Sequence, residues 1–178
     1  MNHITLPKII FLTALTATLW HQTMYAENPS MQISYILEHA YVTRVIDGDT
    51  IEVSLDDSDE KNKVRLIGIN SPETSGRRGR ECYGLESSQF ATKKLQHSSI
   101  TMHRDSTQQN RDKYNRLLRY VTMDTGTDFG LSMIRSGYAY EYTYKNPYAQ
   151  QKLYRSAEKN ARIQSLGLWS ESTCKGKR

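Results

Sequence analysis

The chain has 178 residues, 24% of them charged, and a formal net charge of +5 at pH 7. This length allows one domain of ordinary size with its own core, and the sequence contains no internal repeat or low-complexity linker. The positive charge favours a polyanionic partner without identifying it. The histidines and the two cysteines stand at no metal-ligand spacing, which disfavours a zinc site or a histidine-dependent nuclease.

The first 26 residues differ in composition from the rest of the chain. Lys8 precedes an apolar run over residues 9–19, Ala26 is a small residue, and no acidic residue occurs before Glu27. This pattern predicts a secretory signal peptide over residues 1–26 and export to the periplasm or the medium. The apolar run is too short to favour a permanent anchor, so we expect no stable membrane association after the signal is cleaved.

The next segments predict an arm followed by strands. Apolar and polar residues alternate only partly over residues 27–40, which predicts an N-terminal arm or an edge strand. Residues 41–47, 50–55 and 63–69 are rich in β-branched residues and predict three strands. The turn Asp47-Gly48-Asp49-Thr50 separates the first two and predicts a hairpin between them.

The second half of the chain predicts helices around two further strands. Residues 85–97 are amphipathic and predict a helix, and residues 99–104 and 117–123 predict strands. Residues 128–136 predict a short helix ended by Gly137, and Asn146-Pro147 predicts the start of the last helix. The order predicts an α+β, mainly β fold: an antiparallel five-stranded OB-fold barrel with about three helices over residues 41–171, followed by a basic tail over 172–178.

Only two cysteines occur, Cys82 and Cys174. In an exported protein an even number of cysteines predicts a disulfide. This bond would join the loop after Glu73 to the C-terminal tail. Two unpaired thiols are the alternative.

Polar residues at the ends of the first three strands suggest phosphodiester chemistry. Cleaving a phosphodiester requires positive charge for the transition state and a base beside the attacking water. Arginine holds two phosphate oxygens with one planar group, and a hard cation bound by oxygen ligands adds charge. The sequence supplies candidates for every part: Asp49, Arg65, Asn70, Ser71, Glu73 and Arg116.

Five separated motifs carry a resemblance to a known family. IDGDT, VRLIGINSPE, DKYNR, YTYK and LWSE occur in this order. In order and spacing they are similar to motifs of the staphylococcal thermonuclease family, over roughly residues 41–171. The resemblance implies an OB-fold barrel and a calcium-dependent endonuclease that cuts DNA and RNA and leaves 3′-phosphate ends. The implied partner is therefore nucleic acid, and we expect a monomer.

The resemblance also implies roles for individual residues. Arg65 and Arg116 match the two arginines that hold the phosphate, and Glu73 matches the general base for the attacking water. A further set matches residues beside the bound nucleotide: Lys113, Tyr114, Tyr142 and Tyr144. Alternate tyrosines also commonly cover a protein surface, so stacking on bases and surface packing both remain open for Tyr142 and Tyr144.

The implied calcium ligands include one departure from the family pattern. Asp49 matches a ligand aspartate, and Ser71 matches a threonine that binds through its backbone carbonyl. Asn70 stands where well-known members have a second aspartate, so one negative charge is lost and we expect weaker calcium binding or a changed metal preference.

Two structural alternatives accompany these assignments. The acidic residues between the first two strands can simply form a hairpin turn. Arg65 lies inside an apolar strand, where an unpaired charge is costly, and we expect it to pair with Glu73. The alternative function is a non-catalytic OB-fold module that binds nucleic acid, although Arg65, Glu73 and Arg116 are all retained.

Overall fold

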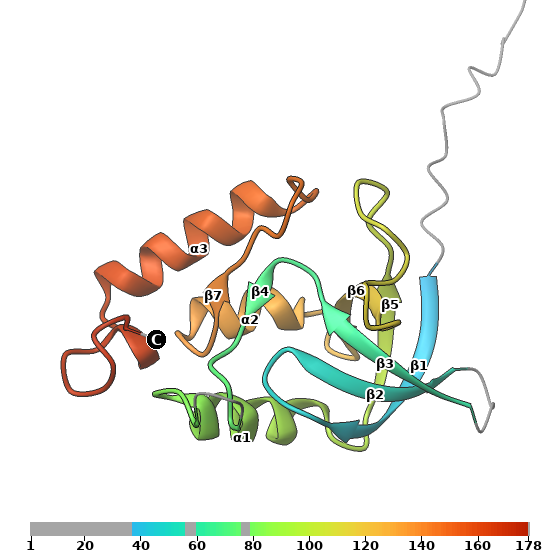
Figure 1. The fold of residues 1–178 in the computed structure, drawn as a ribbon, viewed down its shortest axis with the longest axis horizontal. Helices are drawn as coiled ribbons and strands as arrows, with labels where there is room; N and C mark the ends of the chain where they lie inside the picture. The colour runs from blue at the N-terminus through green and yellow to red at the C-terminus, as the bar shows by residue number, and fades with distance from the viewer. Residues whose placement is uncertain (1–36, 56–59, 76–78, 178) are drawn as a thin grey trace, which may run out of the picture. The chain divides into compact units, whose positions relative to one another are not determined.

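The computed structural model describes residues 37–55, 60–75 and 79–177 (Figure 1). The predicted signal peptide and residues 27–36 of the predicted arm lie outside the described residues. No helix within the described ranges is long and apolar enough to cross a membrane.

Five strands form a closed barrel in the order β1-β2-β3-β6-β5. The strands are β1 (Leu37–Val45), β2 (Thr50–Leu55), β3 (Lys61–Leu66), β5 (Ser99–His103) and β6 (Leu117–Met123). All neighbouring pairs are antiparallel except β3 and β6, which are parallel. The α+β OB-fold barrel is therefore confirmed, but the expectation of a wholly antiparallel barrel is wrong for the pair that closes it.

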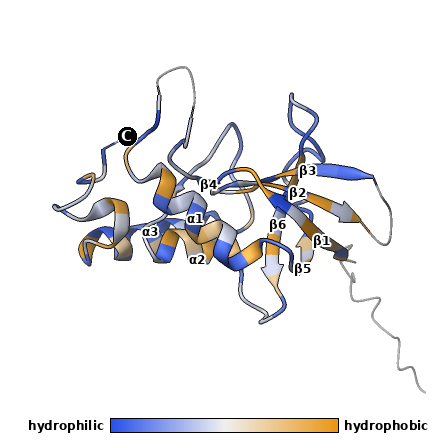
Figure 2. Ribbon diagram, turned by 90° about the horizontal axis from the view of Figure 1, so that it is seen from below, coloured by the Kyte–Doolittle hydropathy of each residue, from blue (hydrophilic) through white to orange (hydrophobic). Residues whose placement is uncertain are grey.

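Alternating apolar residues of the strands fill the barrel. On β2 the side chains of Ile51 and Val53 are buried, whereas Glu52 between them is partly exposed. Because successive strand residues point to opposite faces, this alternation directs one set inward. Hydrophobic and hydrophilic segments follow one another along the strands in Figure 2.

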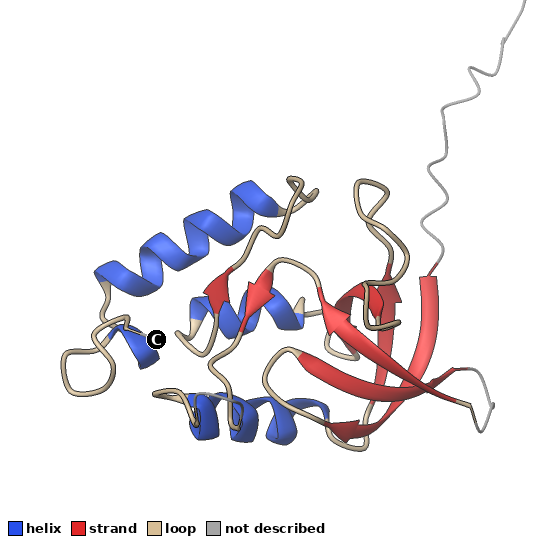
Figure 3. Ribbon diagram, in the orientation of Figure 1, coloured by secondary structure: helices blue, strands red, loops and turns tan. Residues whose placement is uncertain are grey.

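Within the described ranges, three helices and a short 3₁₀ helix accompany the barrel, and Figure 3 shows where they lie beside its strands. They are α1 (Gly84–Leu95), α2 (Phe129–Arg135), α3 (Gln151–Ile163) and η1 (Gly167–Trp169). Gly137 has a φ of 73° and its N–H donates to the Ile134 carbonyl, while the Tyr138 N–H donates to the Met133 carbonyl. This is a Schellman motif, so Gly137 ends α2 as predicted.

The last helix begins four residues after Pro147, at Gln151, so its predicted start is wrong. The Ala149 N–H donates to Asp105 Oδ2 at 2.8 Å, and the Gln150 N–H donates to the Tyr120 hydroxyl at 3.3 Å. Asp105, after β5, and Tyr120 on β6 therefore hold the chain just before α3, instead of a local cap at Asn146.

The predicted third strand is divided in two by a turn at Gly68. Gly68 has a φ of +81°, and a Cβ there would come within 2.5 Å of the Tyr148 ring. Beyond the turn, β4 (Ile69–Asn70) leaves the barrel and pairs antiparallel with β7 (Tyr140–Glu141). Gly68 thus places Asn70 on a separate two-stranded sheet.

A disulfide joins Cys82 and Cys174, which are 92 positions apart in the sequence. Cys174 is buried with the side chains of Ala161, Leu168 and Trp169 in a second apolar cluster outside the barrel. The predicted disulfide is confirmed. Closing a loop of this length stabilises the folded state by about 4–5 kcal/mol in the chain-entropy account.

We predict that Asp105→Asn destabilises the fold at neutral pH. The buried carboxylate accepts hydrogen bonds from Tyr120, from Ala149 and twice from Thr107. Burial alone would raise the pKa of Asp105, but these hydrogen bonds lower it below its usual value. Hydrogen bonds to a charged group contribute about 1.5–3 kcal/mol each, and we expect a net loss of about 2–3 kcal/mol.

The pH dependence of this loss has a defined sign. Because the folded-state pKa is depressed, the contribution is complete above the unfolded pKa of about 4 and is lost as the pH falls through the folded pKa. Urea unfolding of wild type and Asp105→Asn should therefore converge at acidic pH. A difference that persists unchanged at low pH would contradict this account.

Candidate active site

Asp49 lies at the centre of the predicted site and is only 6% exposed. Its Oδ1 accepts a hydrogen bond from the Thr50 hydroxyl at 2.9 Å, and its Oδ2 accepts one from the Ser71 N–H at 2.8 Å. Its carbonyl accepts from the Leu66 N–H at 2.9 Å. The turn before β2 is therefore fastened both to the end of β3 and to the residue that follows β4.

Arg65 on β3 pairs with Asp49, and its expected pairing with Glu73 is wrong. Its Nε lies 3.1 Å from Asp49 Oδ1, and its Nη2 donates to Asn70 Oδ1 at 3.2 Å. The register of β2 and β3 sets Thr50 opposite Arg65, which brings the neighbouring Asp49 within reach. The guanidinium is further fixed because Nη1 donates to the carbonyls of Leu66 and Ile69.

Arg116 reaches the same cluster from the turn before β6. Asp112 Oδ2 lies 2.7 Å from both its Nε and its Nη2, and Nη1 lies 3.5 Å from the Thr50 hydroxyl. Burial raises the pKa of Asp112, but hydrogen bonds from Arg116 and Tyr114 hold it below its usual value. Asp112 is thus a charged partner that orients Arg116 toward Thr50 and Asp49.

Glu73 lies two residues beyond Ser71, with its residue surface exposed. Partial desolvation and the negative charges of Asp49 and Glu81 raise the pKa of its carboxyl, while Arg65 and Arg116 act in the opposite direction. The charges of all four residues therefore influence the pKa of Glu73. An exposed carboxylate with a raised pKa beside two arginines is suited to accept a proton from water.

The residues predicted as metal ligands offer a set of oxygen donors. Asp49, the Asn70 amide oxygen and the Ser71 carbonyl are hard donors of the kind that calcium prefers. Within residues 37–55, 60–75 and 79–177, no cluster of three or more His, Cys, Asp or Glu side chains is arranged to hold a metal ion. Amide and carbonyl oxygens would therefore have to complete the set.

A second carboxyl lies beside Asp49. Asp47 Oδ1 accepts the Asp49 N–H at 2.9 Å. Burial and the negative charge of Asp49 raise the pKa of Asp47 to about 7, and Arg65 opposes this rise. The fit to a divalent cation therefore rests on the hard oxygen donors of Asp49, Asn70 and Ser71.

The predicted nucleotide-binding side chains gather near Arg116. Tyr114 is 67% exposed, and the Nζ of Lys113 and the guanidinium of Arg116 lie 4.9 Å and 5.4 Å from its ring centre. A hydrogen bond to Tyr114 and the proximity of Tyr144 raise the pKa of Lys113. The ring centres of Tyr142 and Tyr144 are 6.5 Å apart, and both side chains are exposed. These tyrosine rings are therefore accessible to solvent and are not part of the hydrophobic core.

Comparison with known proteins agrees with this geometry. A family model described as "Staphylococcal nuclease homologue" matches residues 63–171. The chain belongs to the staphylococcal nuclease family. The thermonucleases of Staphylococcus hyicus and Staphylococcus intermedius are 32% and 31% identical to it, over 96% and 95% of this chain and 99% of each relative. An uncharacterized endonuclease of Escherichia coli is 32% identical over 75% of this chain and 78% of its own.

Membership of the staphylococcal nuclease family makes the protein a hydrolase of the nuclease type. The sequence reasoning missed three residues that the structure adds to the site: Thr50, Glu81 and Asp112. Asp112 had a visible signal, since it stands four residues before Arg116 in the motif DKYNR. Thr50 had one too, since it follows Asp49 in the motif IDGDT and bonds to it. Glu81 acts through contacts with Glu73, eight positions away, and no local signal identifies it.

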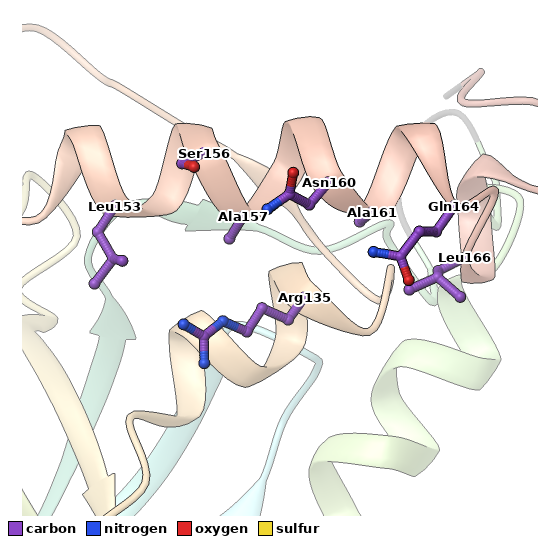
Figure 4. A pocket seen from close by; sticks show the side chains of 8 residues that line it. All are labelled: Arg135, Leu153, Ser156, Ala157, Asn160, Ala161, Gln164 and Leu166. Atoms are coloured by element: carbon purple, nitrogen blue, oxygen red, sulfur yellow. The ribbon is translucent and has the colours of Figure 1, made fainter.

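A pocket of about 310 Å³ lies between α2 and α3, lined by Arg135, Ala157 and Asn160 among others. Figure 4 shows the Arg135 side chain extending from α2 beneath α3. The residues that line this pocket include none of the predicted site residues, so it is separate from the nuclease site.

We predict that Thr50→Val lowers the free energy of unfolding by about 1–2 kcal/mol. Valine keeps the volume of threonine but leaves Asp49 Oδ1 without the hydrogen bond now made at 2.9 Å. The matched control is Thr101→Val on β5, where the hydroxyl contacts His39 only at 3.5 Å. Urea unfolding should show little change for the control, and equal losses in both variants would contradict a special role for Thr50.

Proposed function

We propose that this nuclease is an exported, calcium-dependent endonuclease that hydrolyses phosphodiester bonds of DNA and RNA and leaves 3′-phosphate ends. The observation that carries the proposal is the convergence of two arginines on Asp49. Arg65 contacts Asp49 directly, and Arg116 is linked to it through the Thr50 hydroxyl. Two guanidinium groups beside one carboxylate cluster form a site for a doubly contacted phosphate.

The arginines keep donors for that phosphate. Among the described residues, Arg65 directs Nε, both N–H groups of Nη1 and one of Nη2 to protein oxygens. Arg116 uses Nε and one N–H each of Nη1 and Nη2. The remaining N–H groups can bind non-bridging oxygens and stabilise the charge that develops on them in the transition state.

Glu73 is proposed as the general base. Its carboxylate would take a proton from water as the water oxygen attacks phosphorus, and the bond to the 5′-oxygen would break, which leaves the phosphate on the 3′ side. The exposed position of Glu73 gives water access to it. Asp112 supports the reaction indirectly because it fixes the orientation of Arg116.

Calcium would be held by Asp49, Asn70 and the Ser71 carbonyl. When bound, it would supply positive charge to the phosphate and lower the repulsion between the phosphate and the attacking water. The hard oxygen donors of these three residues support this assignment. Tyr114, Tyr142 and Tyr144, together with Lys113, would contact the neighbouring nucleotide, with the rings available for stacking on bases.

Export is also part of the proposal. We assign residues 1–26 to a signal peptide, 27–40 to an arm, 41–171 to the nuclease domain and 172–178 to a tail. The Cys82–Cys174 disulfide supports an oxidising destination, the periplasm or the medium. We further propose that the mature protein is a monomer without stable membrane association.

Substitution of the base or of a phosphate-binding arginine should abolish most of the activity. We expect Glu73→Gln and Arg116→Ala each to reduce calcium-dependent DNA cleavage by at least about a hundredfold, because each removes a group that acts in the transition state. The control is Arg135→Ala, which removes the same charge from the exposed surface of α2.

Gel electrophoresis of a labelled oligonucleotide, with calcium and with chelator, measures this loss. Undiminished cleavage by Glu73→Gln or Arg116→Ala would contradict the catalytic assignment. If the wild type retards oligonucleotides but leaves them intact in the presence of calcium, the protein is the non-catalytic binding module instead.

Replacing Asn70 with aspartate should strengthen calcium binding. Calcium affinity depends on the number of charged ligands, and Asn70→Asp adds a carboxylate beside Asp49. We expect roughly a tenfold lower calcium dissociation constant by isothermal titration calorimetry, because one ligand gains a negative charge; this change corresponds to about 1.4 kcal/mol. Asn160→Asp adds the same charge on α3 and should leave the constant unchanged. An unchanged constant for Asn70→Asp would remove residue 70 from the ligand set.

A further inference from the structure

A second glutamate holds the main chain of Glu73. The Glu73 N–H donates to Glu81 Oε2 at 3.1 Å, and the Glu81 N–H donates to the Glu73 carbonyl at 2.9 Å. These two bonds join the chain before and after residues 76–78, which lie outside the described part. Glu81 therefore determines where the backbone of Glu73 lies, although it has no part in the reaction proposed above.

The residues that follow Glu81 turn back toward the main chain of Glu73. The Gly84 N–H donates to the Glu81 carbonyl at 3.1 Å. Gly84 itself packs against Glu73, because a Cβ at this position would come within 2.3 Å of the Glu73 carbonyl oxygen. Tyr83, which lies between Glu81 and Gly84 in the sequence, has a left-handed backbone conformation with a φ of 68°. Residues 81–84, here called the clamp, thus form a tight turn around the main chain of Glu73.

The disulfide attaches the clamp to a fixed part of the molecule. Cys82 belongs to the clamp and is exposed, whereas Cys174 is only 6% exposed and packs with Leu168 and Trp169. The tail beyond Cys174 is fastened as well, since the Gly176 N–H donates to the Leu168 carbonyl at 2.8 Å. Cys174 is therefore the anchor, and Cys82 is the end that the bond restrains.

We propose that Glu81 is a positioning residue for Glu73 and that the Cys82–Cys174 bond keeps Glu81 in place, so that nuclease activity depends on the oxidised protein. The inference rests on the proposed role of Glu73 as general base. Neither cysteine belongs to the barrel core, which contains the buried residues of the five strands. Loss of the bond removes the only covalent restraint on the clamp within the described residues and leaves Tyr83 packed against the second apolar cluster, while the barrel keeps its own packing.

The reduction is a two-electron step. A dithiol reductant supplies two electrons and two protons to the S–S bond, which breaks to give the thiols of Cys82 and Cys174, and the reductant becomes a cyclic disulfide. In a reducing compartment the general base would then lose its fixed position. The consequence is a nuclease that reaches full activity only after transfer to an oxidising compartment.

The first experiment tests Glu81 with the disulfide intact. Glu81→Gln keeps an oxygen that can accept the Glu73 N–H, whereas Glu81→Ala does not. We expect Glu81→Ala to lower kcat on DNA by at least about tenfold with little change in KM, because small displacements of catalytic groups have effects of this size or more. Above the pKa of Glu73, Glu81→Gln should stay within about twofold of wild type. Its pH profile should shift to lower pH, because the Glu81 charge that raises the pKa of Glu73 is removed. Glu86→Ala removes a nearby exposed charge on α1 and should leave activity unchanged.

Amide hydrogen exchange gives a readout that is independent of activity. The peptide that contains Glu73 should be protected in wild type and in Glu81→Gln, and it should exchange faster in Glu81→Ala. Equal protection in all three proteins, or full activity of Glu81→Ala, would overturn the positioning role.

The second experiment tests the disulfide. Wild type treated with a dithiol reductant, and the variant Cys82→Ser/Cys174→Ser, should both lose at least about tenfold in kcat while circular dichroism at the assay temperature shows folded protein. The double variant should not respond further to the reductant. Folded, reduced protein with undiminished kcat would overturn the dependence on oxidation.

These outcomes are distinct from failure of the proposed function. If oxidised wild type cleaves DNA and Glu73→Gln does not, the proposed function holds and the Glu81 and cysteine variants decide the inference alone. If Glu73→Gln is fully active, the general-base role fails, and faster exchange at Glu73 in Glu81→Ala would then show only a structural clamp.

Discussion

The site depends on a single buried carboxylate, that of Asp49. Three groups from different parts of the chain meet on it: the Thr50 hydroxyl from β2, the Arg65 guanidinium from β3 and the Ser71 N–H after β4. A buried charge without partners costs several kcal/mol, and removing one partner of a buried pair is strongly destabilising. The same contacts that satisfy Asp49 therefore also hold Arg65, one of the two arginines proposed to bind phosphate, and the chain that leads to Glu73 in fixed positions.

Much of the fold could be predicted from local patterns. β2 begins and ends where the sequence indicated, because apolar Ile51 and Val53 alternate with the partly exposed Glu52 and Ser54. The end of α2 was also predictable, since Gly137 adopts the left-handed conformation that other residues adopt at a cost. The start of α3 was not, because the Ala149 N–H, just before the helix, bonds to Asp105, 44 positions away. The parallel pairing of β3 with β6 is likewise set by barrel closure rather than by either strand alone.

The composition of the candidate site was more predictable than its contacts. The motifs located Asp49, Arg65 and Arg116, but the ion pair of Arg65 depends on the register between β2 and β3, which no single strand specifies. The expected partner, Glu73, lies beyond the turn at Gly68 and the short strand β4, and its main chain is held by Glu81 instead. Residues that carry chemistry can be recognised by type and order, whereas residues that position them depend on tertiary geometry.

The amide at position 70 is compatible with the charge around it. The Asn70 oxygen accepts from Arg65 at 3.2 Å, and its nitrogen lies 3.5 Å from the Ser71 carbonyl, a contact that a carboxylate could not make as a donor. The neighbouring Asp47 already has its pKa raised to about 7 by burial and by the charge of Asp49. A third carboxylate would add to this repulsion whenever no cation is bound. Asn70 therefore adds no further negative charge to the site, and under the proposed calcium role the same missing charge would weaken the attraction for the ion.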